Sequence, residues 1–417
     1  MPRRRARPSI RPVPPADGGT AVITDAATEV AAAARALVRS HDPHAVSADE
    51  FLEAAFDAGL TWVHFPAGLG GRGIARGLQP VVDAIFAEAG APSLVSLNPI
   101  GTGMAAPTLC EHAQSDEQKR RWLHPLATAQ DIWCQLFSEP GAGSDLAGLA
   151  TSAVRDGDEW VVNGQKVWTT LAHCARWALL LARTDPDAPK HKGLTYFVVD
   201  MHASGVQTRP LRQMTGQAEF NEVFLSDVRI PDAHRLGAVG AGWRVAMTTL
   251  MNERSSIGAS GSRRGDGTIS DAVALWAQRP DRRSPVRRDR LTQLWLRSEA
   301  QRLTAQRAHA TATAQGPGPE GSIGKLVGAE LNQRVYEFCL DLLGPDGTLY
   351  DDYTMRHIGP ADSNTGATVQ ERFLRSRANT IEGGTSEVLR NILGERVLGL
   401  PGDPRVDSGP WREVPRG

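Results

Sequence analysis

The 417-residue sequence has no run of eighteen or more apolar residues, which excludes an ordinary transmembrane helix. Its N-terminal stretch, MPRRRARPSIRPVPPADGG, is basic and rich in proline, and it lacks the apolar core of a secretory signal. We therefore expect a disordered tail over residues 1–26, with an arginine-rich targeting arm as the alternative. These absences favour a cytoplasmic protein that does not act at a membrane.

Cysteine is scarce as well. The four cysteines are widely scattered, and no Cys-x-x-Cys pair or Cys/His spacing typical of a metal site occurs. We therefore expect a reduced protein without a bound metal. The formal net charge of −1 gives no electrostatic reason to expect a nucleic acid as partner. The length exceeds that of one ordinary hydrophobic core and indicates two or three substructures.

Three regions follow one another along the chain. Residues 27–130 are mostly helical, because apolar residues such as Val30, Ala33, Ala34 and Leu37 recur with the period of a helix. Residues 131–240 favour short strands, and residues 241–401 return to the helical period. We assign residues 402–417 to a second tail. The predicted fold is mainly α, with an N-terminal helical domain, a central β domain and a C-terminal helical domain.

Within the β region, Asn163-Gly164 is a strong hairpin signal between the expected strands 159–162 and 165–170. Further short strands are expected over residues 178–182, 195–200 and 222–225. In the last region we expect loops over residues 279–290 and 315–322.

Three blocks of sequence carry the functional signal. The first is WCQLFSEPGAGSD (133–145), in which Gly141 and Gly143 allow close approach of a ligand to the backbone. The second is VVNGQKVWTT (161–170), where Trp168 on its own would be read as a buried core aromatic. The third is IEGGTSEVLRNILGER (381–396), an amphipathic helix after a Gly-Gly loop, with Thr385 as its expected N-cap.

At this spacing the three blocks resemble the signatures of the acyl-CoA dehydrogenases, flavoenzymes that oxidise acyl thioesters between Cα and Cβ. The resemblance covers residues 40–401 and implies a β-barrel-like middle domain and a C-terminal four-helix bundle. It implies FAD as cofactor, with Ser138 hydrogen-bonded to the flavin and Trp168 against its ring. The residues carried over as FAD contacts are Gln135, Phe137, Ser138, Gly143, Ser144, Trp168, Thr169, Thr170, Gly344, Gly347, Thr385 and Glu387.

The reaction requires a carboxylate that removes the α-proton of the thioester. Many family members carry this base at the position of Gly383, and Glu382 stands one residue before it. A second family pattern places the base on the first helix after the β domain. In GWRVAMTTLMNERSSIGA (242–259), Ala246, Leu250, Glu253 and Ile257 share one face, where burial would raise the pKa of the glutamate. We favour Glu253 as base and keep Glu382 as the alternative.

Polarisation of the thioester carbonyl is the second requirement. The resemblance implies hydrogen bonds to its oxygen from the FAD ribityl hydroxyl and from the backbone N–H of Gly383, each contributing about 3–4 kcal/mol to the transition state. It also places Ser144 and Arg254 at the substrate. Arg282 or Arg283 is a weak candidate for the FAD pyrophosphate, because the Phe-Gly of the family's motif is missing there.

The sequence thus predicts FAD-dependent dehydrogenation of an acyl-CoA or acyl-carrier-protein thioester. Two alternatives stay open: an oxidase or hydroxylase on the same fold, and a non-catalytic partner subunit of a heteromeric dehydrogenase. The resemblance implies an electron-transfer flavoprotein or another acceptor as redox partner. It also implies a homodimer or homotetramer in which the turn at Gly344 and Gly347 covers the FAD of a neighbouring subunit.

Overall fold

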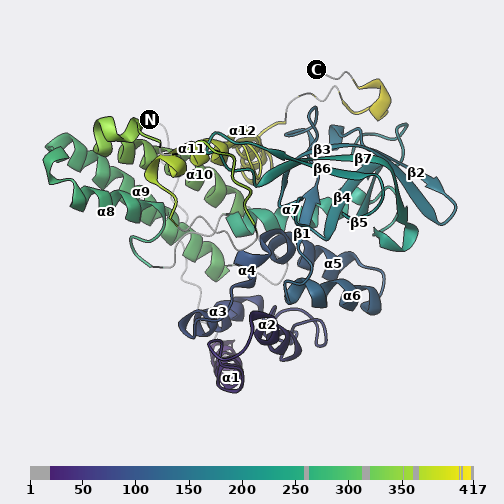
Figure 1. The fold of residues 1–417 in the computed structure, drawn as a ribbon, viewed down its shortest axis with the longest axis horizontal. Coiled ribbons are helices and arrows are strands. Elements are labelled where there is room, and N and C mark those ends of the chain that lie inside the picture. Colours follow the sequence, from purple (N-terminus) through teal and green to yellow (C-terminus); the bar gives the residue numbers. More distant parts are fainter. Residues whose placement is uncertain are drawn as a thin grey trace, which may run out of the picture. The chain divides into compact units, whose positions relative to one another are not determined.

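The computed structural model describes residues 19–257, 263–311, 320–350, 352–359, 366–402, 404 and 407–414. The chain divides into two compact units, Met1–Pro92 and Ser93–Gly417 (Figure 1). Helices come first, a block of strands follows, and helices return, so the predicted order of elements is confirmed. Over the described residues no helix combines the length and the apolar character that a membrane span requires.

The first unit is built from three helices: α1 (Gly19–Ser40), α2 (Ala48–Asp57) and α3 (Gln79–Glu88). Its core includes Val30, Ala34, Phe51 and Leu60, all fully or almost fully buried. Helix α1 already begins at Gly19, inside the stretch that the sequence assigned to a tail.

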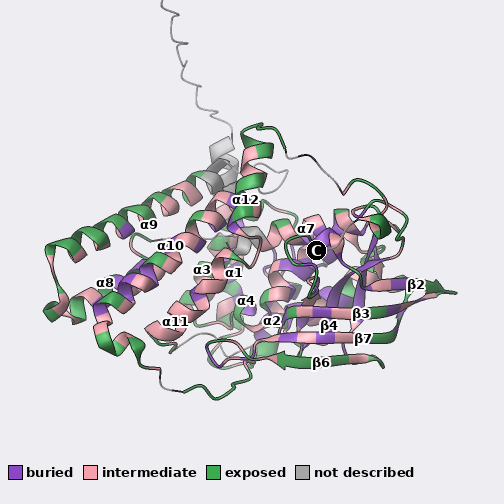
Figure 2. Ribbon diagram, turned by 90° about the horizontal axis from the view of Figure 1, so that it is seen from above, coloured by how far each residue is buried: buried purple, intermediate pink, exposed green. Residues whose placement is uncertain are grey.

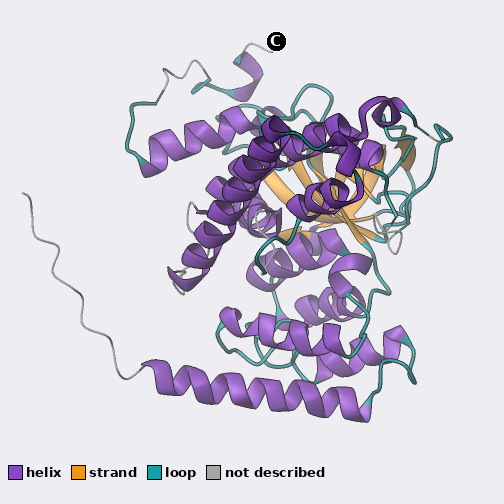
Figure 3. Ribbon diagram, turned by 90° about the vertical axis from the view of Figure 1, so that its left-hand side faces the viewer, coloured by secondary structure: helices purple, strands orange, loops and turns teal. Residues whose placement is uncertain are grey.

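The second unit begins with the short helices α4 (Leu94–Leu97), α5 (Ala106–His112) and α6 (Asp116–Ala127). The Ser115 side chain caps α6 by accepting a hydrogen bond from the backbone N–H of Gln118. A mixed sheet follows, and its strands gather in one block (Figure 3). They are β1 (Trp133–Leu136), β2 (Ser152–Asp156), β3 (Glu159–Thr170), β4 (Trp177–Arg183), β5 (Leu194–Asp200), β6 (Val206–Leu211), β7 (Phe220–Pro231) and β8 (Arg235–Leu236).

The strand order is β6-β7-β3-β2-β4-β5-β8, and β1 pairs with β4 in parallel. All seven residues of β4 are buried, which makes this strand the centre of the sheet core. The core continues through Leu136, Val162, Phe197 and Val223 from neighbouring strands. Strands β1 and β3 both contribute to this core. The first sequence block begins in β1 and the second lies in β3, so both are anchored in the buried sheet.

The prediction of a hairpin turn at Asn163-Gly164 is wrong. Both residues lie inside the single strand β3, at a register irregularity in its pairing with β7. The Asn163 side chain exchanges two hydrogen bonds of 2.9 Å with Asp227, and a Cβ on Gly164 would lie 2.3 Å from Thr151 Oγ1. Close packing therefore requires this glycine. The turn lies earlier, where Asp156 pairs with Glu159 around Gly157 at φ 63°.

The C-terminal helices of this unit are α7 (Gly242–Ile257), α8 (Thr268–Gln278), α9 (Pro285–Thr311), α10 (Glu320–Leu343), α11 (Val369–Ser376) and α12 (Ser386–Ile392). Helices α8, α9 and α11 all pack on α10, and their shared core includes Ile269, Leu294, Val335 and Phe338. Figure 2 shows the buried faces of α8 and α10 turned to this core and the exposed outer face of α9.

Two expectations for this region change. Helix α9 begins at Pro285, so the loop predicted over residues 279–290 is shorter. Most of the loop predicted over residues 315–322 lies outside the described residues. The amphipathic helix of the third block ends at Ile392 and continues as a wider turn over Leu393–Val397. Its apolar stripe is buried only at its start: Leu389 is fully buried, whereas Val397 and Leu400 are exposed.

Candidate active site

The Gly-rich turn of the first block lies directly beside the second block. The backbone N–H of Val167 donates to the carbonyl of Ser138 over 2.9 Å. The turn itself is closed by two backbone hydrogen bonds between Glu139 and Ala142. Gly143 and Ser144 at its tip are exposed to solvent. A backbone hydrogen bond therefore connects the two blocks that the sequence assigned to the flavin, from strand β3 to the Gly-rich turn.

A sealed ion pair fixes the start of this turn. Lys166 is fully buried, and its ammonium donates to Glu139 Oε1 (2.9 Å) and to the carbonyls of Phe137 and Leu181 (3.0 Å each). Glu139 also accepts from the backbone N–H groups of Ala150 and Thr151. Burial acts to raise the pKa of Glu139, but Lys166 and these hydrogen bonds outweigh it and lower the pKa overall. The Glu139 carboxylate is thus charged at neutral pH, while burial lowers the pKa of Lys166 against the opposing effect of Glu139.

Trp168 stands out in strand β3. Its backbone is left-handed, with φ 60°, at a bulge where the pairing with β7 shifts between Lys166 and Thr169. Its side chain is 61% exposed, which is rare for tryptophan and contradicts a core role. A bulky residue in this conformation is strained, and such strain gathers at functional sites. The bulge presents the Trp168 ring on the surface, beside the Phe220 ring at 6.0 Å.

Four buried hydroxyls, among them those of Thr61 and Thr151, have no hydrogen-bond partner in the described part of the chain, and the other two lie in the second and third sequence blocks. One is Thr169 Oγ1, next to Trp168, and the other is Ser386 Oγ, next to Thr385. Buried polar atoms are nearly always hydrogen-bonded, so each of these exceptions calls for a ligand or a water. The two in the second and third blocks fit a polar cofactor held between strand β3 and the Gly-Gly loop.

An arginine links the sheet to the third block. Arg375 on α11 pairs with both carboxylate oxygens of Glu382 (3.0 and 2.9 Å) and reaches Glu219 at 3.4 Å. Its guanidinium also lies over the Phe220 ring at 5.7 Å. Asn379 Nδ2 donates to Glu382 Oε1 over 2.8 Å. Trp168, Phe220, Arg375 and Glu382 therefore form a continuous row of contacts, and the carboxylate of Glu382 already has three donors.

The Gly-Gly loop of the third block holds a tight conformation. Gly383 and Gly384 have φ 61° and 96°, values that favour glycine at both positions. The buried Lys325 of α10 donates to the Gly384 carbonyl over 2.5 Å. The N–H of Gly383 donates to no acceptor among the described residues. Thr385 caps α12 as expected, accepting from the N–H of Val388 over 3.2 Å.

The residues after this loop line an open polar groove of about 620 Å³ between α10 and α12. Thr385, Ser386 and Glu387 form one side of it, and Glu330, Gln333 and Arg334 of α10 form the other. Two of the predicted FAD contacts, Thr385 and Glu387, thus share one surface with the unpartnered Ser386 hydroxyl.

Glu253 lies on α7, and its side chain is half-buried. The helix is anchored by Thr249, whose hydroxyl shares hydrogen bonds of 2.9 Å with Thr108 of α5 and Tyr196 of β5. On the same face as Glu253, Ala246 is fully buried. The side chain of Arg254 lies outside the described residues.

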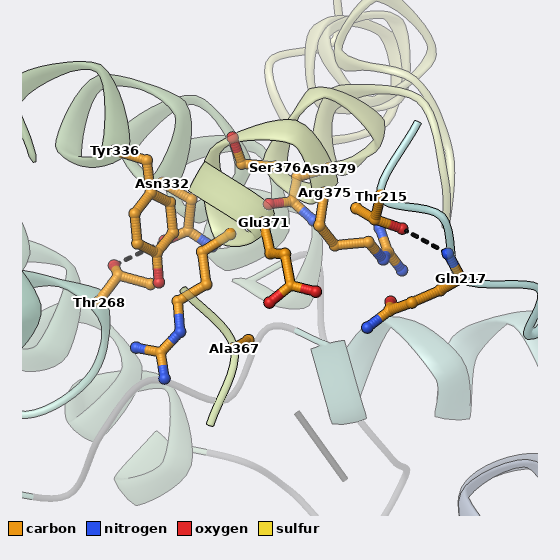
Figure 4. A pocket seen from close by; sticks show the side chains of 11 residues that line it. Thr215, Gln217, Thr268, Asn332, Tyr336, Ala367, Glu371, Arg375, Ser376 and Asn379 are labelled. Carbon is orange, nitrogen blue, oxygen red and sulfur yellow. Dashed lines mark hydrogen bonds between the residues drawn. The ribbon is translucent and has the colours of Figure 1, made fainter. Parts of the chain in front are cut away.

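A second cavity of about 250 Å³ opens next to Arg375 (Figure 4). Thr215 and Gln217 line it from the sheet side, and Asn332, Tyr336 and Glu371 line it from α10 and α11. The cavity brings carboxylate, guanidinium, amide and hydroxyl groups together where the sheet meets the helices.

The Gly344 turn and the arginine loop before α9, separate in the sequence, lie together. A Cβ on Gly344 would lie 2.2 Å from Arg282 Nη2, and the φ of Gly344 is 64°. Arg282 Nε is buried and has no hydrogen-bond partner within the described ranges. Of the two arginine candidates, Arg282 is therefore the one beside the turn.

The remaining predicted contacts are spread over the sheet and the turn. Gln135 on β1 and Thr170 on β3 are half-buried. The Phe137 ring is buried against Tyr196 at 5.8 Å, so only its backbone can face a ligand. Gly347 lies in the short helix Gly344–Thr348. No metal-ligating cluster of His, Cys, Asp and Glu occurs among the described residues.

Comparison with known families gives matches along most of the chain. Residues 21–130 match the acyl-CoA dehydrogenase N-terminal domain, residues 134–228 the middle domain and residues 240–398 the C-terminal domain. The acyl-CoA dehydrogenase FadE34 of Mycobacterium tuberculosis is 42% identical over 355 residues, covering 84% of this chain and 46% of that protein. The chain thus spans about half the length of FadE34.

A second relative matches in length as well. The acyl-CoA dehydrogenase IpdE1 of Mycobacterium tuberculosis is 41% identical over 350 residues, covering 82% of this chain and 86% of that protein. Among solved structures, the Tcur3481-Tcur3483 steroid ACAD is 27% identical with a TM-score of 0.70, covering 92% of this chain and 98% of that one. The ChsE4-ChsE5 complex of Mycobacterium tuberculosis is also 27% identical, with a TM-score of 0.67, covering 92% and 99%. With all three domains matched in order and these relatives in hand, the chain belongs to the acyl-CoA dehydrogenase family.

Proposed function

We propose that this chain dehydrogenates an acyl thioester between Cα and Cβ, with Glu253 as the base that removes the α-proton. The observation that carries the choice of base is the pairing of Glu382. Both of its carboxylate oxygens accept hydrogen bonds from Arg375, and Asn379 adds a third. A carboxylate whose oxygens already accept three hydrogen bonds is directed at those donors and not at a substrate. We therefore take the reacting carboxylate from α7, on which the sequence places the other candidate.

Membership of the family makes the chain an oxidoreductase and FAD its cofactor. Among the unpartnered buried hydroxyls, those of Thr169 and Ser386 lie in the sequence blocks assigned to the flavin and fit a polar cofactor. We assign Ser138, Trp168 and Thr169 to the ring end of FAD, and Thr385 and Glu387 to the groove beyond it. When bound, FAD accepts the hydride that leaves the β-carbon.

The chain's own groups then have three tasks. Glu253, half-buried on α7, takes the α-proton. The N–H of Gly383, which has no acceptor among the described residues, donates to the thioester oxygen and stabilises the enolate-like charge. Trp168 covers the reacting face and excludes water from it.

The substrate we propose is an acyl-CoA, since the curated relatives reported above are both named acyl-CoA dehydrogenases. The Tcur3481-Tcur3483 protein is described as a steroid enzyme, so bulky ring-bearing acyl-CoA esters belong in the test set beside straight chains. An acyl-carrier-protein thioester is the alternative form of substrate. An electron-transfer flavoprotein is the acceptor we propose, with oxygen as the alternative.

We further propose that the active form is an oligomer. Two structural relatives are complexes of two different chains. The Gly344 turn, with the unpartnered Arg282 Nε beside it, has the character of a contact for a phosphate of FAD in a neighbouring subunit. Exposed apolar side chains at the start of the third block (Ile381) and just after it (Val397 and Leu400) offer a surface for such a neighbour. Light scattering with and without FAD tests this, since an active flavin-saturated monomer would contradict it.

The decisive experiment combines flavin content with reduction kinetics. We expect the purified protein to be yellow and to bleach anaerobically with an acyl-CoA. Glu253→Gln should keep the flavin spectrum and lose several orders of magnitude in the reduction rate, within the range of about 10²–10⁴ or more for a general base. Glu382→Gln is the matched control and should lose less than about tenfold. A reversed ranking would move the base to Glu382, and a protein without flavin bands after FAD is supplied would refute the proposal.

A further inference from the structure

The C-terminal residues 407–414 fold back onto the sheet domain, although the sequence assigned them to a tail. In Figure 1 this yellow segment lies beside the strands, away from α12. Pro410 pairs with Pro189 in the loop between β4 and β5, and the N–H groups of Trp411 and Arg412 donate to the carbonyls of Ala188 and Pro186. We call residues 407–414 the strap.

Trp411 of the strap contacts the C-terminal end of the Gly-rich turn. Trp411 Nε1 donates to the carbonyl of Gly148 over 3.1 Å, and its ring stacks on the guanidinium of Arg183 at 4.2 Å. Arg183 is itself buried and donates to the carbonyls of Ala147 (2.6 Å) and Leu149 (3.1 Å). The carbonyls of Ala147, Gly148 and Leu149, shortly after the GAGSD motif, are therefore bound by the strap or by the arginine beneath it.

A lysine makes a second connection between the strap and the turn. Lys190 is almost fully buried and donates to Asp145 Oδ1 over 2.7 Å, while it also pairs with Asp407 of the strap. Asp145 is the last residue of the GAGSD motif and is largely exposed. One ammonium thus joins the tip of the turn to the C-terminal segment.

Together these contacts divide the turn into two halves with different supports. The first half is fixed from inside by Glu139 and Lys166, and Glu139 also binds the N–H groups of Ala150 and Thr151. The second half, residues 145–149, is fixed from outside by Lys190, Arg183 and Trp411. Between the two supports stand Gly143 and Ser144, and the family resemblance places Ser144 at the substrate, where the pantetheine arm of the thioester would enter.

We propose that the strap positions the entrance turn for the thioester arm, with Trp411 and Lys190 as positioning residues that set affinity for acyl-CoA rather than the rate of chemistry. This inference rests on the proposed function, because it requires the arm to pass the turn. Removing the strap contacts should widen the range of positions that residues 145–149 sample. A looser turn binds the arm less well, while the flavin and Glu253 are untouched.

The test uses Trp411→Ala in the full-length holoprotein and measures flavin reduction over a range of acyl-CoA concentrations. A stacked cation and a hydrogen bond are lost, so we expect KM to rise by about tenfold while kcat changes less than about twofold. Trp411→Phe keeps the stacking ring and should recover part of the affinity. Lys190→Met provides a second route to the same loss if Trp411→Ala folds poorly. Phe224→Ala is the matched control. The Phe224 ring on β7 stacks in a similar way on the guanidinium of Arg209, 4.6 Å from the ring centre, and its removal should leave KM unchanged.

Amide hydrogen exchange supplies a readout that does not depend on activity. In Trp411→Ala, exchange of Gly148 and Leu149 should become several-fold faster, because their hydrogen bonds lie within the loosened half. Exchange of Ala150 and Thr151, held by Glu139, should stay as in the wild type. Unchanged KM in Trp411→Ala, or kcat falling as much as KM rises, would overturn the inference even if the wild type is active. A wild type that no acyl-CoA reduces would instead refute the proposed function, and the strap's role toward the thioester with it.

Discussion

The Gly-rich turn and the Gly-Gly loop each use a glutamate of their motif to bind a cation, but water reaches the two pairs to different extents. The Glu139–Lys166 pair is sealed, with side-chain exposures of 9% and 0%. The Arg375–Glu382 pair is partly open, with exposures of 26% and 31%. The first pair joins strand β3 to the turn that follows β1, whereas the second joins a helix to a loop and also touches Glu219 beside β7.

This difference indicates a fixed part and an adjustable part of the site. A buried ion pair with every donor satisfied has one geometry, since any displacement leaves a charge without a partner. A half-exposed pair tolerates displacement because water replaces what is lost. The sheet therefore provides a rigid surface for a cofactor, and the Gly-Gly loop can adapt to it. Both glutamates hold a cation in place, and we propose that a carboxylate on a third element, Glu253 of α7, carries the chemistry.

Breaking the sealed pair should have the largest effect on stability. Lys166→Met leaves Glu139 charged and buried, and we expect the free energy of unfolding to fall by about 3–5 kcal/mol. Urea denaturation of the apoprotein measures it. The double variant Lys166→Met with Glu139→Gln removes the orphaned charge and should recover part of the loss. A single variant that loses no more than the double variant would contradict the sealed geometry.

Breaking the open pair should cost less. Arg375→Met removes a half-exposed guanidinium whose partners can be solvated. We therefore expect the free energy of unfolding, from the same urea denaturation, to fall by about 1–2 kcal/mol. The loss should shrink at high salt, which screens an exposed pair more than a buried one. An equal loss for Arg375→Met and Lys166→Met would remove the distinction between the two regions.

Lowering the pH should test the sealed pair, because the direction of the Glu139 pKa shift determines the pH range in which stability is lost. The pKa of Glu139 is lowered in the folded state from its ordinary 4.5, so its charged form stabilises the fold at neutral pH. That contribution is lost as the pH falls below about 4.5 and passes through the folded-state pKa. Unfolding midpoints measured at descending pH should therefore fall more steeply for the wild type than for Glu139→Gln. Parallel curves would show that Glu139 does not carry this dependence.

Substitutions at Trp168 should show the smallest change in stability. The ring is largely exposed, so its loss removes little packing, whereas a left-handed backbone costs any L-residue about 1–2 kcal/mol relative to glycine. Trp168→Gly should therefore be more stable than Trp168→Ala by about 1 kcal/mol in the apoprotein. Both variants should lose FAD affinity equally, as equilibrium dialysis would show. Equal stabilities would mean that the bulge relaxes when the tryptophan is removed.

Much of the fold could be predicted because its signals are local. Helical periodicity located the helices, and runs of Val, Leu and Phe located the strands. The misplaced hairpin shows the limit of such signals. Asn163-Gly164 has the composition of a turn, but close packing against Thr151 and the bonds to Asp227 keep it inside β3. Contacts between residues this far apart in the chain leave no local trace.

The site shows the same division between local and distant signals. The motif residues Ser138, Trp168 and Thr385 were found from the sequence because they stand in recognisable blocks, and their proposed roles remain predictions. Arg375, Phe220 and Lys325 were missed, since each acts through a contact that only the fold creates. The strap was missed for another reason: a short segment rich in proline and glycine reads as a tail, and its anchor, Trp411, is a single residue.

The complete burial of β4 has a consequence for the synthesis of the chain. WALLLAR is an apolar, β-prone segment of the kind that aggregates when exposed. On the ribosome, its parallel neighbour β1 emerges earlier, but its antiparallel neighbour β5 follows only at Leu194–Asp200. During that interval one edge of β4 has no partner, and such an unpaired edge makes the nascent chain prone to aggregation. Synonymous codons between Arg183 and Leu194 would then affect the yield of soluble protein without altering a single residue.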